Sequence, residues 1–176
     1  MLTKLKRGFF QVTSIRFNMR LSGNIVHQQS FDFGINIRQA QKDDADICVD
    51  LIYSAGPEMY EYVFTDEGKQ AHEFIRYEFI NGSRFAGHLI HAVAELNGKV
   101  VGVASFYHGR QLWSLAKDAF ISVLRFYGVR QAWGVFVRGN QLNSVVENPQ
   151  RNEMYIANVG VKKEAWGRGI ASALIK

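Results

Sequence analysis

A single cysteine, Cys48, is present among the 176 residues, which excludes an internal disulfide and a cysteine-cluster metal site. One cysteine fits a reducing compartment, and its apolar neighbours predict that Cys48 lies in the core. No apolar run approaches the roughly 18 residues that a membrane span needs. With 47% hydrophobic and 21% charged residues, the composition is typical of one soluble globular domain, and we expect a cytoplasmic protein that binds no metal.

Acidic residues are missing from residues 1–31, which hold five of the 21 basic side chains: Lys4, Lys6, Arg7, Arg16 and Arg20. The rest of the chain carries 16 basic and 16 acidic side chains and is neutral. The net charge of +5 therefore does not indicate that the rest of the chain binds nucleic acid. Gly8 to Phe17 is too interrupted for the apolar stretch of a secretory signal. We predict that residues 1–33 are a basic, poorly ordered leader, with a transit peptide as the alternative.

Regular patterns begin at Gly34. Alternation at Ile35 and Ile37 predicts a strand that ends near Gln39, and the apolar spacing after it predicts a helix from Asp43 or Asp44 to Gly56–Pro57. The folded part of the chain is therefore predicted to begin with a strand followed by a helix.

A second helix is predicted between Thr65, as its cap, and Asn81–Gly82. The segment before it, Glu58 to Phe64, is aromatic and acidic. Its Tyr60 and Tyr62 are candidates for a substrate pocket, although packing in the core explains them better.

Two β-rich runs between Leu89 and Phe106 flank Asn97–Gly98, a dipeptide typical of a tight hairpin turn. Amphipathic spacing then predicts two helices inside an insertion at about 110–148, separated by Gly128. Their faces could meet a membrane surface or a partner, but packing on the domain's own sheet is the better explanation. Met154 to Val161 is predicted to be the next strand.

Chemistry is concentrated in residues 153–176, which read as a strand, a glycine turn and the start of a helix. Gly167 and Gly169 let the backbone approach a ligand, and the free N–H groups of a first helical turn favour an anion such as a pyrophosphate. The spacing excludes a P-loop, because no Gly-Lys-Ser/Thr follows. It also excludes a dinucleotide fingerprint, because Ser172 stands where the third glycine would be.

The order of helices, hairpin, strand, glycine turn and helix resembles the GNAT superfamily of N-acetyltransferases. Its acetyl-CoA motif, R/Q-x-x-G-x-G/A, is matched by the segment Trp166-Gly167-Arg168-Gly169-Ile170-Ala171. Trp166 departs from the usual Arg or Gln, and Lys163 stands where proline is frequent. The segments IRQAQKDDADICVDLIYSAGPEMYEYVF and VAELNGKVVGVASFY resemble the N-terminal half of the same family, in the form with a helical insertion before the fourth strand.

The resemblance implies a mixed α/β, acyl-CoA N-acyltransferase-like fold at residues 34–176. It also implies that this chain transfers an acetyl group from acetyl-CoA to a primary amine without a covalent intermediate. The expected contacts to acetyl-CoA come from the six-residue turn and the strand before it: Val159, Gly160, Val161, Trp166, Gly167, Arg168, Gly169, Ile170 and Ala171. Gly160 suits the bulge that the family has in this strand.

Two residues are candidates for catalysis by their positions relative to the motif. Glu153 lies thirteen residues before Trp166, where histone-type members have a general base, although an exposed carboxylate at a strand end is the simpler explanation. Tyr155 follows on the same face of the strand and could orient substrate or water. A base is useful because an alkyl amine is mostly protonated at neutral pH.

The family's fold extends beyond the helix at which this sequence stops, so we expect a domain that is incomplete at its C-terminus. Three interpretations stay open: a fragment of an intact enzyme, a natural truncation completed in a homodimer or limited to acyl-CoA binding, and an inactive interaction protein. The motif binds the donor alone, so the acceptor is not predicted.

Overall fold

The computed structural model describes residues 29–31, 34–83, 86–143 and 150–175. Five antiparallel strands form one sheet in the order β1-β2-β3-β4-β5. Their bounds are β1 Gln29–Phe31, β2 Ile35–Gln39, β3 His91–Leu96, β4 Lys99–His108 and β5 Met154–Val161. The predicted strands at 35–39 and 154–161 are confirmed, and the mixed α/β class is confirmed with them.

The hairpin between β3 and β4 turns at Asn97–Gly98, as predicted. Both residues have positive φ, 53° and 73°, which is the conformation that a two-residue turn between twisted strands requires. The hairpin places Leu96 opposite Lys99. The register of β3 and β4 then shifts by one residue between Glu95 and Ala94, and the pairing ends with His91 opposite Ser105.

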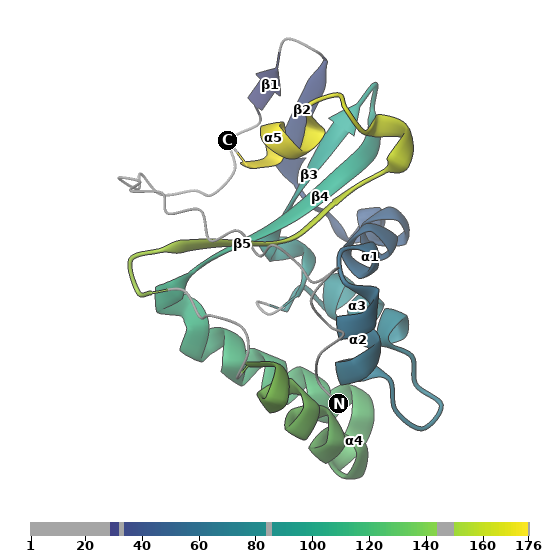
Figure 1. Cartoon of the computed structure of the whole chain (residues 1–176), viewed down its shortest axis with the longest axis vertical. Coiled ribbons are helices and arrows are strands. Elements are labelled where there is room, and N and C mark those ends of the chain that lie inside the picture. Colours follow the sequence, from purple (N-terminus) through teal and green to yellow (C-terminus); the bar gives the residue numbers. More distant parts are fainter. Residues whose placement is uncertain (1–28, 32–33, 84–85, 144–149, 176) are drawn as a thin grey trace, which may run out of the picture.

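Helices cover both faces of the sheet (Figure 1). On one face, α1 (Ala45–Ser54) and α3 (Ala71–Asn81) pack on strand residues such as Val93 and Val103, in a cluster that includes the fully buried Cys48. On the other face, α5 (Ile170–Ile175) packs on small residues of β3 and β4, among them Ala94 and Ala104. The short helix α5 is thus held by tertiary contacts rather than by its own length.

The segment predicted as a connection between the first two helices is itself a helix, α2 (Pro57–Phe64). Pro57 is its first residue, a position where the missing N–H of proline costs nothing. Thr65 ends α2, and its hydroxyl accepts the N–H of Ala71, the first residue of α3, at 3.3 Å. The N-cap position of α3 is Gln70, which is paired reciprocally with Glu73. The predicted contribution of Thr65 to the start of α3 is therefore confirmed, although α3 begins six residues after it, and the predicted end of α3 at Gly82, in a left-handed conformation, is confirmed too.

The insertion forms α4 (Leu112–Asn143), which is broken at Gly128 by φ 75° and ψ 168°. The break divides it into the two predicted helices. The buried side of α4 packs on α2 and α3 through Val123, Tyr127 and Val135. Tyr127 also donates a hydrogen bond to the Phe64 carbonyl. The insertion therefore lies against the helical layer, away from α5 (Figure 1).

The predicted leader at residues 1–33 and the predicted end of the insertion at Asn148–Pro149 lie almost wholly outside the described residues. Within the leader, Gln29–Phe31 forms the edge strand β1, paired with Ile35 to Ile37 of β2. No helix in the described segments combines the length and the apolar character of a membrane span.

Candidate functional site

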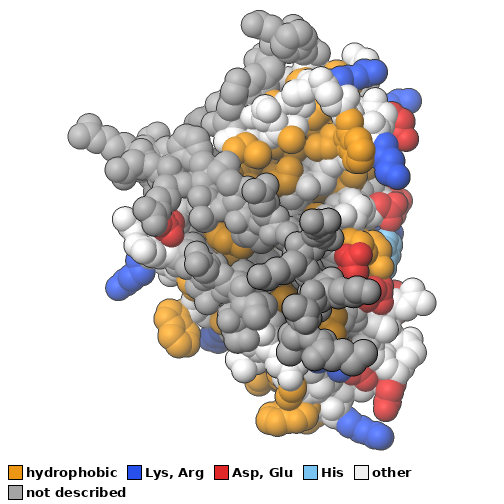
Figure 2. Space-filling model, in the orientation of Figure 1, with side chains coloured by type: hydrophobic (Ala, Val, Ile, Leu, Met, Phe, Trp, Pro, Cys, Tyr) orange, Lys and Arg blue, Asp and Glu red, His pale blue; other side chains and the backbone are white. Residues whose placement is uncertain are grey.

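A cavity of about 550 Å³ opens where the chain leaves β5 and enters α5. Its walls come from three elements: the end of α1, the end of β5, and the turn with the start of α5. The lining residues are Ser54, Ala55, Val159, Val161, Ala165, Trp166, Gly167, Gly169, Ile170, Ala171 and Ser172. Figure 2 shows hydrophobic side chains gathered at this upper end of the molecule, where Figure 1 places α5.

The structure brings seven of the nine predicted acetyl-CoA residues into this one cavity. Arg168 is exposed on the turn and does not line it, and Gly160 is buried under α1. Ser54, Ala55 and Ser172 line the cavity although the sequence analysis did not select them. Ser54 and Ala55 lie more than 100 residues before the turn, and no local pattern could have connected them with it.

The turn before α5 depends on glycine for its backbone conformation. Gly167 and Gly169 have φ of 74° and 75°, where other residues are strained, and a Cβ at either position would meet no atom within 4 Å. The Ala173 N–H donates to the Gly169 carbonyl (2.9 Å), so the N–H groups at the start of α5 have no intrahelical acceptor. An open space bordered by free N–H groups suits an anionic ligand such as a phosphate.

Trp166, which replaces the usual Arg or Gln of the motif, holds the turn against the strand. Its indole N–H donates to the Val161 carbonyl (2.8 Å), while the side chain is 63% exposed beside the cavity. The substitution therefore supplies a hydrogen bond across the turn and an aromatic surface at its edge. This function of the indole N–H could not be read from the sequence.

A β-bulge interrupts the pairing of β5 with β4. Gly160 pairs with Val103 and Ala157 with Ser105, so that Asn158 and Val159 both face the single residue between Val103 and Ser105. The bulge that was expected at Gly160 thus lies at Asn158, which has a positive φ of 51°. Asparagine tolerates this conformation better than most residues do.

Gly160 has a different function, because α1 crosses β5 at this point. A Cβ on Gly160 would lie 2.4 Å from the Leu51 carbonyl oxygen, which is closer than real contacts allow. Glycine is therefore needed for the close approach of α1, whose last turn carries Ser54 and Ala55 to the cavity.

A polar chain fixes the bulge from the helical side. The Tyr60 hydroxyl donates to the Asn158 side-chain carbonyl (2.7 Å), the Asn158 amide donates to the Ser105 hydroxyl (3.3 Å), and Ser105 donates to the Ala157 carbonyl (3.0 Å). Tyr60 is 8% exposed, and burial raises the pKa of its hydroxyl, which stays protonated as a donor. Tyr60 is thus part of the core, as the sequence favoured, whereas Tyr62 is 51% exposed.

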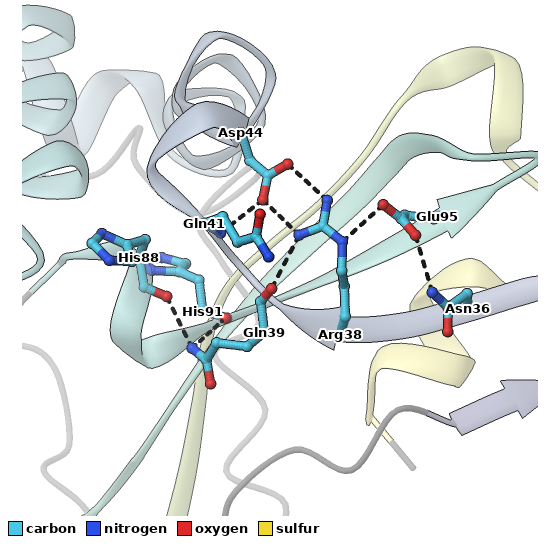
Figure 3. Close-up of polar contacts among 8 residues, drawn as sticks. All are labelled: Asn36, Arg38, Gln39, Gln41, Asp44, His88, His91 and Glu95. Atoms are coloured by element: carbon cyan, nitrogen blue, oxygen red, sulfur yellow. Dashed lines mark hydrogen bonds and ion pairs between the residues drawn. The ribbon is translucent and has the colours of Figure 1, made fainter.

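An ion-pair network at the opposite end of α1 holds this helix on the sheet (Figure 3). Arg38 of β2 binds both carboxylate oxygens of Asp44, at 2.7 and 2.8 Å, and Glu95 of β3 at 2.8 Å. Burial alone would raise the pKa of Asp44, but the hydrogen bonds from Arg38 and from the Gln41 N–H outweigh it and lower that pKa. The start of α1 is therefore fixed to two strands.

The two predicted catalytic residues lie at the other end of β5, away from the glycine turn. Tyr155 is 6% exposed, and its ring packs on Tyr107 with centroids 5.0 Å apart. Burial raises the pKa of Tyr155, so its hydroxyl is protonated at neutral pH. The Glu153 carboxylate accepts the Gln150 N–H at 2.8 Å and orders the turn that leads into β5. Neither residue lines the cavity.

No group of three or more His, Cys, Asp or Glu side chains suited to a metal ion occurs among the described residues. The cavity walls themselves carry backbone groups, hydroxyls and apolar side chains, and no carboxylate. This donor set suits an anionic organic ligand better than a cation.

Comparison with known proteins agrees with this geometry. The profile of the Acetyltransferase (GNAT) family matches residues 50–176. An N-acetyltransferase from Staphylococcus aureus Mu50 has a similar structure, with a TM-score of 0.60 and 22% identity over 79% of this chain and 72% of that one. A second structure, described as an acetyltransferase, has a TM-score of 0.57 and 20% identity over 79% and 69%. No curated protein sequence matches the chain.

The family match covers more than half of the chain and includes the second half of α1, the β3–β4 hairpin, β5 and the glycine turn. The structural neighbours, which are under 25% identical, independently support the same fold. The α4 insertion lies inside the matched range, between the hairpin and β5. This chain belongs to the acetyltransferase (GNAT) family of acyltransferase enzymes, in a form with a helical insertion before the strand that leads into the glycine turn.

Proposed function

We propose that this chain transfers an acetyl group from acetyl-CoA to a primary amine. The observation that carries the proposal is the cavity between β5 and α5, in which a bulged strand, two positive-φ glycines and the start of a helix meet. Membership of the family supports acyl transfer, and the cavity supports acetyl-CoA as the donor.

The N–H groups from Gly167 to Ala171 would hold the pyrophosphate, and the exposed Arg168 side chain would add a salt-sensitive contact. Val159 and Val161 line the same cavity, and β5 is the last strand in the described order, so its outer edge pairs with no described strand. The pantetheine arm would extend along this edge in the manner of an added strand.

In the reaction, the neutral amine nitrogen attacks the thioester carbonyl, the C–S bond breaks, and the proton lost by the amine ends on the CoA thiolate. A backbone N–H at the bulge would polarise the thioester carbonyl. Before the attack, Glu153 would accept the first proton, which the ammonium form of the substrate loses, through ordered water that passes it on to solvent, since its carboxylate does not line the cavity. Tyr155, with a protonated hydroxyl, would orient the amine or that water.

Calorimetric titration of the full chain with acetyl-CoA tests the donor site. Gly169→Glu places a carboxylate and a strained φ in the turn and should abolish binding. Gly68→Glu is the matched control, because Gly68 also has a positive φ, 80°, and open space around its Cβ, but lies in the α2–α3 connection. Equal loss in both variants, or no binding by the unchanged chain, would overturn the proposed donor site.

A binding-competent chain can then be tested for turnover. Release of CoA thiol is followed with a series of primary amines, and Glu153→Gln should lower kcat most at low pH, where fewer amine molecules are neutral. An unchanged pH profile in Glu153→Gln would exclude Glu153 as the base and leave acetyl transfer itself intact.

A further inference from the structure

Five of the nine exposed large hydrophobic residues in the described part of the chain lie on one element, α4. They are Trp113 (90% exposed), Phe120 (50%), Val129 (82%), Trp133 (72%) and Val137 (41%). We call these five residues the α4 face. The sequence favoured packing of the α4 apolar residues on the domain's own sheet, and this prediction was wrong: Val123 and Val135 pack on helices α2 and α3, and the α4 face is exposed.

The break at Gly128 divides α4 into two helical arms, and the α4 face takes residues from both. Phe120 precedes the break by eight residues and Phe136 follows it by eight, and their rings stack with centroids 4.7 Å apart and an interplanar angle of 13°. The arms therefore run antiparallel and in contact. On the second arm, Val129, Trp133 and Val137 recur every four residues and so share one side of the helix.

Exposed cations accompany these side chains. Lys117, Arg125 and Arg130 are exposed on α4, and none of them forms an ion pair with a described acidic residue. Arg138, by contrast, is bound to Asp66 at 2.8 Å and belongs to the contact between α4 and the domain. Hydrophobic side chains project along the lower edge of the molecule in Figure 2, where Figure 1 places α4, with basic side chains at the same edge.

We propose that the α4 face docks on the surface of an anionic lipid bilayer. Tryptophan is favoured at the boundary between headgroups and acyl chains, where its ring is buried and its N–H stays hydrated. Unpaired Lys and Arg beside it complement anionic headgroups, each contributing about fivefold in affinity at low salt. The combination of exposed tryptophan and valine with unpaired cations is typical of helices that lie on a membrane surface.

The same composition argues against two other partners for the α4 face, a second copy of the chain and a nucleic acid. The centre of a homodimer interface is depleted in charged residues. By helical spacing, the exposed Lys117 lies one turn from Trp113, and the exposed Arg130 lies one turn from Trp133. A nucleic acid would use the cations and stacking rings, but not the exposed Val129 and Val137. A bilayer surface would contact both the apolar and the basic side chains. The cavity lies at the start of α5, which is at the opposite end of the molecule from α4 (Figure 1).

Co-sedimentation of the full chain with phosphatidylcholine vesicles, with and without phosphatidylserine, tests the proposal. We expect binding to the anionic vesicles, with a blue shift of tryptophan fluorescence. Trp113→Ser combined with Trp133→Ser should weaken this binding at least tenfold. Leu89→Ser is the control, because Leu89 is 60% exposed but lies before β3. Circular dichroism of each variant shows that it is folded.

The charge component is tested separately. Arg125→Gln with Arg130→Gln should weaken binding to anionic vesicles by about 25-fold at low salt and change little at high salt. Lys42→Gln with Lys99→Gln removes the same charge from exposed positions outside α4 and should have little effect.

Three outcomes overturn the proposal. Binding that survives both α4 double variants would place the lipid contact elsewhere in the chain. Equal binding to neutral and anionic vesicles would exclude the complementarity of charge. A concentration-dependent dimer that Trp113→Ser with Trp133→Ser dissociates, in a chain that binds no vesicles, would assign the α4 face to a second copy instead.

Discussion

Gly160 lies where α1 crosses β5, and we expect Gly160→Ala to displace this helix. The added Cβ would lie 2.4 Å from the Leu51 carbonyl oxygen and 2.9 Å from its carbon. These are backbone atoms, so no rotamer change can relieve the overlap. An ordinary contact begins near 3.4 Å, and α1 must therefore move by about 1 Å.

The free energy of unfolding should fall by about 2 kcal/mol. Overpacking costs about 1 to 3 kcal/mol, and the rigid backbone places this case at the upper end. Alanine recovers up to about 1 kcal/mol by restricting the unfolded chain. Since Ser54 and Ala55 move with α1, the cavity should change shape, and acetyl-CoA affinity should fall with stability.

Urea unfolding measures the effect. With an m-value of about 2 kcal/mol/M, the midpoint should drop by about 1 M. Gly139→Ala is the matched control, because its Cβ would lie 3.9 Å from Val63, an ordinary contact, and alanine stabilises a helix interior by about 0.5 to 1 kcal/mol. A Gly160→Ala chain as stable as the unchanged one would show that α1 does not approach β5 so closely.

Two further predictions concern buried polar groups. Tyr60→Phe leaves the Asn158 carbonyl without its donor and should cost about 1 to 2 kcal/mol, measured by the same unfolding assay; a neutral result would mean that Tyr60 does not hold the bulge. His91 is 1% exposed, and burial lowers its pKa to about 4. Between about pH 6.5 and 4 the unfolded chain binds a proton on His91 that the folded chain does not bind. As the pH is lowered through this range, the free energy of unfolding should therefore decrease by up to about 1.4 kcal/mol per pH unit. His91→Phe should flatten this slope, and an unchanged slope would contradict a neutral, buried His91.

The parts of the fold that depend on local chemistry were predictable. Asn97–Gly98 defined a hairpin turn, Gly82 defined the end of α3, and Gly167 with Gly169 defined the turn at the cavity, because each requires a positive φ that few other residues adopt. The strand Met154–Val161 was predicted with its correct bounds from its β-rich composition. Family resemblance then assigned these elements to one site.

The parts that depend on tertiary contacts were not predictable. α2 was missed because its aromatic residues favour several structures, and burial of Tyr60 and Val63 decides between them. The position of the bulge at Asn158 rests on partners in α2 and β4. Ser54 and Ala55 reach the cavity only because Gly160 lets α1 approach β5.

The insertion begins and ends at adjacent points of the sheet. His108 pairs with Met154, and the Gly109 N–H donates to the Glu153 carbonyl at 2.9 Å, so β4 and β5 would form a simple hairpin if a short turn replaced α4. The insertion therefore connects the paired ends of β4 and β5 in the way that a hairpin loop does, but with many more residues. Such a loop can be lengthened, remodelled or recharged without shifting the strands, so the proposed docking surface on α4 and the cavity can change independently of each other.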